Sequence, residues 1–97
     1  MSFKIIRFES TPNPNAVKCV LDRPITDRPK SFLSADTAAG QPLAEPFFAL
    51  DGVRNVLMNG DWVSVNKLDD VAWTTLKPKI RRVLRDLKPE TGDGSDG

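Results

Sequence analysis

Residues 53–67, VRNVLMNGDWVSVNK, predict a β-hairpin and indicate the architecture of the whole chain. Two apolar runs, 53–58 and 62–67, flank the turn sequence Asn-Gly-Asp. Asn-Gly between such runs favours a tight reversal, because both residues tolerate a positive φ. Alternation places Val63 and Val65 on one face of the second run. We therefore expect two antiparallel strands that bury this face.

A second connection, 11–15 (TPNPN), lies between two further strand-like runs. Each proline fixes its own φ, lacks an N–H donor and restricts the residue before it, so the loop is stiff. Stiff loops with polar side chains lose little entropy on binding, which makes Thr11, Asn13 and Asn15 candidates for partner binding. The alternative is a turn that only shapes the sheet.

The rest of the chain predicts two helices. The first is expected from Pro42, because proline suits a first helical turn, to the Asp-Gly at 51–52. The second is expected to begin with Asp69 or Asp70 as its N-cap. Its buried stripe recurs at helical spacing and consists of Trp73, Leu76, Ile80, Val83, Leu84 and Leu87. Pro78 lies within this stripe and is expected to kink or restart the helix.

These elements predict a two-layer α+β sandwich, with a mainly antiparallel sheet of four to five strands and two helices on one face. The expected strands are 3–9, 16–21, 31–33, 53–58 and 62–67. Residues 22–30 combine prolines with charged residues and are expected to form a loop. Residues 1–88 make up one expected domain. Residues 89–97 carry acidic side chains and no apolar ones, so a disordered acidic tail is expected there.

Composition narrows the range of functions. The net charge is +1 and 28% of the residues are charged, so no global field attracts nucleic acid or membranes. The absence of histidine removes the commonest general base and metal ligand, and no acid–base pair converges. We therefore expect no enzyme and no cofactor. The first residues contain neither an apolar signal core nor an Arg- and Ser-rich transit segment, so we expect a cytoplasmic protein.

Cys19 is the single cysteine, which excludes an internal disulfide and any site built from several thiolates of one chain. It shares a strand face with Val17 and Leu21, which favours a small buried hydrophobe. The alternative is a cluster bridged between two subunits, with one thiolate from each and small-molecule thiols. That site needs an exposed thiol with basic neighbours, and the adjacent Lys18 points to the opposite face.

Basic residues crowd the last helix beside Asp86 alone. The cluster consists of Lys77, Lys79, Arg81, Arg82, Arg85 and Lys88. A solvated outer face is the ordinary interpretation of such a cluster. The functional interpretation is a docking surface for an acidic partner protein, through Lys77, Arg81 and Arg85. Nucleic acid is disfavoured because no exposed aromatic residues interleave with the cations. A further hypothesis is that Glu90, Asp93 and Asp96 fold back and screen this face, so that deleting residues 89–97 would raise binding to an acidic partner at low salt.

Taken together, these segments resemble the Nfu N-terminal domain, which occurs in iron–sulfur cluster scaffold proteins of the Nfu type. The similarity rests on TPNPNAVK at 11–18, DWVSV at 61–65 and W-x-x-L-K-P at 73–78. It runs from about Phe3 to Leu87, and the first and last of these motifs are fairly specific in combination. The resemblance implies a compact α+β module associated with iron–sulfur cluster assembly or delivery.

In full-length members of that family, the cluster ligands lie in a separate C-terminal domain with a Cys-x-x-Cys motif. With one cysteine, this sequence lacks the thiolates that a 4Fe–4S cluster needs. The resemblance therefore implies a non-catalytic interaction module that docks protein partners in cluster maturation and holds no cluster itself. No nucleic-acid or membrane partner is expected. Two alternatives stay open: a small-ligand or anion-binding module that uses the Asn amides and helix N-terminal N–H groups, and cluster or metal handling by Cys19 across a dimer.

Overall fold

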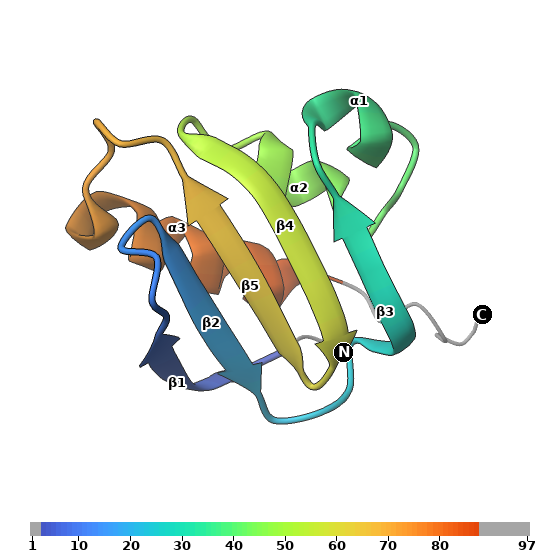
Figure 1. The fold of residues 1–97 in the computed structure, drawn as a ribbon. Helices are drawn as coiled ribbons and strands as arrows, with labels where there is room; N and C mark the ends of the chain where they lie inside the picture. Colours follow the sequence, from blue (N-terminus) through green and yellow to red (C-terminus); the bar gives the residue numbers. More distant parts are fainter. Residues whose placement is uncertain (1–2, 88–97) are drawn as a thin grey trace.

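The computed structural model describes residues 3–87, which form a five-stranded antiparallel sheet with the strand order β1-β2-β5-β4-β3. The strands are β1 (Ile5–Ser10), β2 (Ala16–Leu21), β3 (Thr26–Phe32), β4 (Val53–Gly60) and β5 (Trp62–Lys67). The helices are α1 (Ala35–Ala38), α2 (Glu45–Phe48) and α3 (Trp73–Asp86). β1 and β3 form the two edges of the sheet (Figure 1). The expected α+β class is confirmed, and the short α1 adds to the two expected helices. The tail expected at 89–97 lies outside the described residues.

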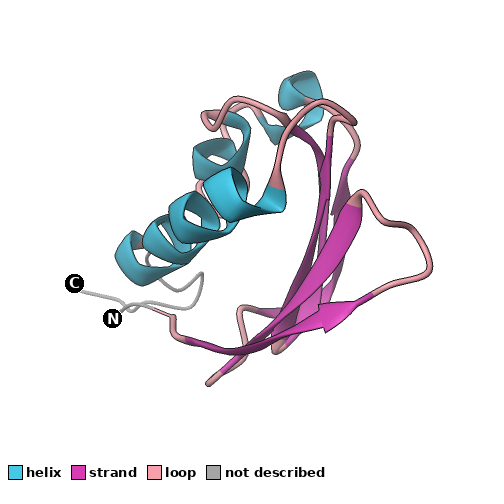
Figure 2. Cartoon of the chain, turned by 90° about the vertical axis from the view of Figure 1, so that its left-hand side faces the viewer, coloured by secondary structure: helices cyan, strands magenta, loops and turns pink. Residues whose placement is uncertain are grey.

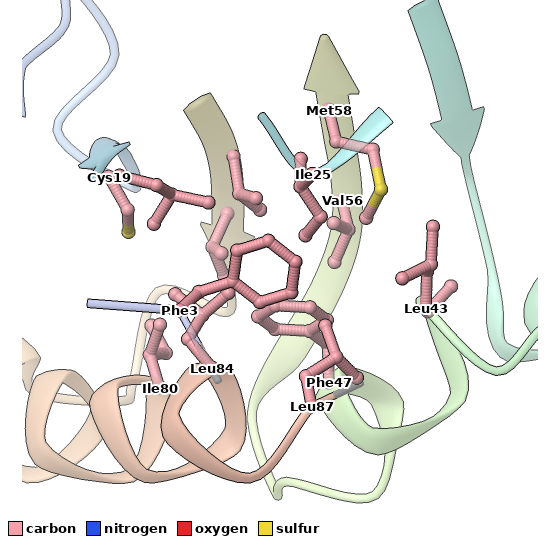
Figure 3. Close-up of a cluster of buried hydrophobic side chains, with 14 of the residues drawn as sticks. Phe3, Cys19, Ile25, Leu43, Phe47, Val56, Met58, Ile80, Leu84 and Leu87 are labelled. Atoms are coloured by element: carbon pink, nitrogen blue, oxygen red, sulfur yellow. The ribbon is translucent and has the colours of Figure 1, made fainter. Parts of the chain in front are cut away.

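The helices lie on one side of the curved sheet, and the core fills the space between the two layers (Figure 2). The inward side chains of β2 are Val17, Cys19 and Leu21, as alternation predicts. Opposite them, α3 buries Leu76, Ile80 and Leu84. Phe3 and Phe47 lie between the sheet and α3 (Figure 3). None of the helices described within residues 3–87 has the length and apolar character needed to cross a membrane.

β4 and β5 form the predicted hairpin. Asn59 pairs with Trp62 across the turn, and Gly60 adopts a φ of 58°. This left-handed conformation is inexpensive for glycine, which has no Cβ. Val63 and Val65 are fully buried, so the inward face of the hairpin is the one that the sequence predicts.

The expectation of a loop over 22–30 is wrong in its second half, because β3 begins at Thr26. Ile25 donates its backbone N–H to the carbonyl oxygen of Gly60 at 2.7 Å, and its side chain is buried. Pro29 concealed this strand in the sequence. An edge strand tolerates proline because its outer backbone groups need no ladder partner. A register shift beside Pro29 absorbs the irregularity in the pairing with β4.

The start of α3 also differs from the expectation. The N-cap is Ala72, which makes no side-chain capping bond. Asp69, one of the expected caps, instead accepts a hydrogen bond from the side chain of Asn15. The helix continues through Pro78 without restarting, because its buried stripe holds it against the sheet. In α2, Pro46 lies in the first turn, where its missing N–H removes no helical bond.

Candidate functional site

The loop 11–15 is held by its own side chains. Thr11 Oγ1 lies 2.8 Å from the carbonyl oxygen of Asn13 and 3.1 Å from that of Ala16, and it also accepts a bond from the Asn13 N–H. Asn13 Oδ1 accepts the N–H of Asn15 at 2.9 Å. These local bonds replace the ladder bonds that two prolines prevent. The loop is therefore a turn with a defined internal structure.

The two amide side chains of this loop also bond to β5 and to the segment that follows it. Asn13 Nδ2 donates to Asn66 Oδ1 at 3.2 Å. Asn15 Oδ1 accepts a bond from Lys67 Nζ at 3.0 Å, while Asn15 Nδ2 donates to Asp69 Oδ1. Asn15 thus bridges the ammonium of Lys67 and the carboxylate of Asp69. An amide side chain can do this because it carries both an acceptor oxygen and N–H donors.

Lys67 is only 7% exposed and lies on the inward face of β5. Besides its bond to Asn15, its ammonium donates to the carbonyl oxygen of Leu68 at 3.2 Å and lies 5.5 Å from the centre of the Trp73 ring. The indole Nε1 of Trp73 in turn donates to the carbonyl oxygen of Pro14 at 2.9 Å. A buried ammonium needs such partners because an unpaired buried charge is costly. Sequence reasoning missed Lys67, although its place in the inward alternation of β5 carried the signal.

Cys19 is fully buried and points from β2 toward the helix layer (Figure 3). Desolvation raises the pKa of its thiol to about 12, and the charges of Lys77 and Arg81 lower it by less. The thiol therefore stays protonated at neutral pH, which makes it a poor nucleophile and a poor metal ligand. Within residues 3–87, no group of three or more His, Cys, Asp or Glu residues is arranged to hold a metal ion. This geometry agrees with the interpretation of Cys19 as a buried hydrophobe.

A groove of about 450 Å³ lies between the start of β1 and α3. Its lining consists of Phe3, Lys4, Ile5, Pro78, Arg81, Arg82 and Arg85. We call this feature the β1–α3 groove. Four of these side chains are cationic, whereas Phe3 and Ile5 belong to the buried core. The groove therefore combines an apolar base with cationic sides.

The three basic residues singled out in the sequence form one row along α3, because they are spaced four residues apart. Lys77 Nζ lies 4.9 Å and Arg81 Cζ 5.3 Å from the centre of the Phe8 ring on β1. Arg85 pairs with Asp86 at 3.3 Å. Among residues 3–87, Lys77 and Arg81 form no ion pair. Positive charge is therefore left uncompensated beside β1.

The two sets of predicted site residues occupy different places. The loop 11–15 contacts the end of β5 and the start of α3, whereas the basic row faces β1. Sequence reasoning did not single out Phe8 or Lys4 as parts of a site. The signal for Phe8 was the apolar character of both faces of its strand. Lys4 had no comparable signal, because its place at the groove depends on how α3 packs.

A second hollow, of about 250 Å³, lies on the opposite side of α3 and is also bordered by α2. It is lined by Pro46, Leu50, Lys79, Arg82, Val83, Asp86 and Leu87. Two cations and one carboxylate make it less strongly charged than the β1–α3 groove. The β1–α3 groove is therefore the better candidate for an electrostatic docking site.

Comparison with known proteins relates the chain to one family. Residues 6–90 match the family described as scaffold protein Nfu/NifU, N-terminal. NifU-like protein 5, mitochondrial, of Arabidopsis thaliana is 39% identical over 83 residues, which cover 84% of this chain and 30% of that protein. The NFU1 iron-sulfur cluster scaffold homolog, mitochondrial, of Homo sapiens is 31% identical over 87 residues, which cover 88% of this chain and 34% of that protein. The chain thus spans about a third of the length of these relatives. The mitochondrial designation is theirs, and a cytoplasmic location for this chain stays a prediction.

Two solved structures share the fold. The crystal structure of protein SAV1430 from Staphylococcus aureus superposes with a TM-score of 0.68 at 27% identity, covering 82% of this chain and 96% of that one. The solution structure of SeR13 from Staphylococcus epidermidis superposes with a TM-score of 0.58 at 30% identity, covering 82% of this chain and 93% of that one. In both structures the shared module makes up nearly the whole solved chain.

Proposed function

Because the chain belongs to the Nfu/NifU N-terminal family, we propose that it is a docking module in iron–sulfur cluster assembly or delivery and that it holds no cluster itself. The human relative is named as an iron–sulfur cluster scaffold, which supports the biological setting. The observation that carries the docking part of the proposal is the cationic β1–α3 groove. Its partner would be a protein of cluster maturation that presents acidic side chains.

The chemistry of the groove favours a protein partner with this character. Arg81, which lines the groove, and Lys77, which lies beside it over Phe8, have no carboxylate partner within residues 3–87. An incoming carboxylate therefore has no ion pair of that part of the chain to break before it binds these two cations. Complementary charge at an interface accelerates association and rejects partners of the wrong sign. The apolar base formed by Phe3 and Ile5 would add area that is shielded from water.

The state of Cys19 supports the second part of the proposal. A bridged cluster needs a thiolate that solvent-borne iron can reach, whereas this thiol is buried and protonated at neutral pH. Its burial also disfavours the alternative of cluster handling across a dimer. The small-anion alternative is weakened as well, because one amide N–H of Asn13 and one of Asn15 already donate to partners within the protein, which leaves each side chain one donor for an anion.

The loop 11–15 has a supporting part in this proposal. Its bonds to β5 and α3 hold the shape of the module, and direct contact of Thr11, Asn13 or Asn15 with a partner stays a prediction. The double variant Asn13→Ala/Asn15→Ala tests that contact. Once the fold is verified by circular dichroism, an unchanged set of partners would remove the loop from the binding surface.

The function is tested with a panel of purified iron–sulfur cluster assembly proteins and apo acceptor proteins. Binding of each to the chain is measured by titration calorimetry at low salt. We expect saturable binding to at least one member of the panel, weakened by about tenfold or more in Arg81→Glu/Arg85→Glu. Lys79→Glu reverses a charge on the other side of the same helix, and it is compared with Arg81→Glu alone, which changes the net charge by the same amount.

Three results would contradict the proposal. The first is no binding to any panel member, and the second is binding that the double charge reversal leaves unchanged. The third is a visible absorption band in the chain alone after anaerobic reconstitution, if Cys19→Ser abolishes that band. The third result would instead establish cluster handling by Cys19.

A further inference from the structure

The hydrogen bonds that β2 makes to its two neighbours show which backbone groups of β1 point toward β2 and which point away from the sheet. Asp22 donates its N–H to the carbonyl oxygen of Lys4 at 2.9 Å, whereas Leu21 donates to the carbonyl oxygen of Asp61, beside β5. Even-numbered residues of β2 therefore bond to β1 and odd-numbered ones to β5, because antiparallel ladders alternate. Phe8 is opposite Cys19, an odd-numbered residue. Its N–H and C=O consequently point away from the sheet, at the free edge.

The two edges of the sheet differ in how well they are protected. β3 carries Pro29 and a register shift beside it, two features that discourage pairing with another chain. β1 contains no proline, and its own register shift between Ile5 and Arg7 leaves regular pairing at 7–10. It also exposes Ile6, an aliphatic residue with 58% of its surface accessible. Of the two edges, β1 is therefore the one to which a further strand can pair more readily.

The basic row of α3 lies over the same stretch of edge. Phe8 shares the inward face with its partner Cys19, and the cationic groups of Lys77 and Arg81 lie over its ring. On a strand added antiparallel to β1, the residue directly opposite Phe8 would project its side chain to this face, next to both cations. The residue of the added strand that bonds to the backbone of Phe8 is therefore the same residue whose side chain lies next to Lys77 and Arg81.

We infer that the β1 edge accepts an extended acidic segment of a partner protein as an added antiparallel strand, with its carboxylates facing the row Lys77, Arg81 and Arg85. This inference rests on the proposed docking function and specifies its geometry. The main chain of the segment bonds to the outward groups of Phe8. Acidic residues at alternate positions contact the row, and the residues between them face away from α3.

Spacing supports alternate acidic positions. Residues two apart on a strand stand about 6.6–6.8 Å apart, and residues four apart on a helix rise by about 6 Å. Lys77 and Arg81 lie at Phe8, whereas Arg81 and Arg85 line the groove near Ile5, so the row and β1 run side by side in opposite directions. Successive carboxylates on one face of the added strand therefore match successive cations of the row.

The probe is a short synthetic peptide that alternates valine with aspartate, acetylated and amidated at its ends, added to the full chain. We expect saturable binding by calorimetry and slower hydrogen exchange at the Phe8 N–H. The amides of Arg7 and Glu9 already face β2, so their exchange serves as an internal control. Binding is expected to weaken by about tenfold or more in Arg81→Glu/Arg85→Glu but to persist in Lys79→Glu.

N-methylation of the peptide tests the strand geometry independently of charge. In the antiparallel register, the aspartate amides face β1 and the valine amides face solvent. Methylation of the aspartate amides should abolish binding, whereas methylation of the valine amides should leave it intact. Equal binding of both methylated peptides would overturn the strand inference. If the assembly partner still depends on Arg81 and Arg85 in that case, the docking function stands without it.

Two other occupants of the edge would also overturn the assignment to a partner. One is the chain's own acidic segment at 89–97, revealed if removing its charges with Glu90→Gln/Asp93→Asn/Asp96→Asn raises peptide affinity by about tenfold. The other is a second copy of the chain, revealed by a dimer in ultracentrifugation that dissociates when the peptide is added. A monomer whose peptide affinity is unchanged by the triple substitution supports the inference.

Discussion

The indole of Trp73 donates a hydrogen bond to the backbone carbonyl oxygen of Pro14 at 2.9 Å. These residues are far apart in the sequence and belong to the two motifs that mark the family, TPNPN and W-x-x-L-K-P. Their contact fastens the β1–β2 loop to the first turn of α3, which has no side-chain cap of its own. The two motifs therefore form one structural unit at the end of the sheet.

Removing this bond should lower stability without disturbing the core. Trp73→Phe keeps an aromatic ring beside Lys67 but loses the Nε1 donor. We expect a loss of about 1 kcal/mol in the free energy of unfolding, measured by urea denaturation. Trp62→Phe is the control, because the Trp62 ring also lies beside a lysine ammonium, that of Lys18, while its indole forms no hydrogen bond among residues 3–87. Equal losses in the two variants would show that the bond to Pro14 contributes nothing specific.

Asn15 should matter more than Asn13, although both belong to the same motif. Asn15→Ala would deprive the buried Lys67 ammonium of its side-chain acceptor, at a cost of about 2 kcal/mol. Asn13 is exposed, so water replaces its lost bonds in Asn13→Ala and the cost should stay below about 1 kcal/mol. Chemical denaturation of both variants tests the order. The opposite order would contradict the role given to Lys67.

Alkaline pH should destabilise the protein through Cys19. The unfolded thiol ionises near 9.0, whereas the folded thiol keeps its proton until about 12. The contribution of this thiol to the free energy of unfolding is therefore fully present below pH 9.0. It decreases as the pH rises toward 12, by up to about 1.4 kcal/mol per pH unit. Thermal unfolding across this range should be less pH-dependent in Cys19→Ala. The difference in pH dependence between the wild type and Cys19→Ala separates the contribution of this thiol from that of the lysines, which also change charge in alkaline solution.

Gly52 should resist substitution because two constraints coincide there. Its φ is 96°, and an added Cβ would lie 2.5 Å from Cγ2 of Val71. Gly40 has a φ of 77° but open space around it, so Gly40→Ala isolates the cost of the backbone conformation. We expect Gly52→Ala to cost at least about 1 kcal/mol more than Gly40→Ala in urea denaturation. Equal costs would mean that Val71 moves aside freely.

Short-range patterns were enough to predict most of the fold. Asn-Gly between alternating runs predicts the β4–β5 hairpin, and helical spacing predicts the buried stripe of α3. Two of the differences between expectation and structure, in β3 and at the cap of α3, have a common physical origin. Thr26 joins a strand because Ile25 bonds to Gly60 on another strand, and Asp69 leaves the cap because Asn15 binds it. Contacts between residues this far apart in the sequence cannot be predicted from the local helix and strand propensities of either residue.

The candidate site was predicted only in part for the same reason. The spacing of Lys77, Arg81 and Arg85 places them in one row, which the structure contains. That the row lies over Phe8, at a free sheet edge, depends on strand order and helix packing. The polarity of Asn13 and Asn15 marked them as candidates for binding. Their internal bonds to Asn66, Lys67 and Asp69 became apparent only in the folded chain.

Docking of a partner at the β1–α3 groove can be observed residue by residue by mapping amide chemical shifts in a ¹H–¹⁵N spectrum. The labelled chain is titrated to saturation with an assembly protein that binds it. We expect the largest shifts at residues 3–8 and 77–85, and additional shifts at 11–15 would support direct contact of the loop with the partner. Shifts concentrated at 11–15, with the groove unaffected, would contradict docking at the groove.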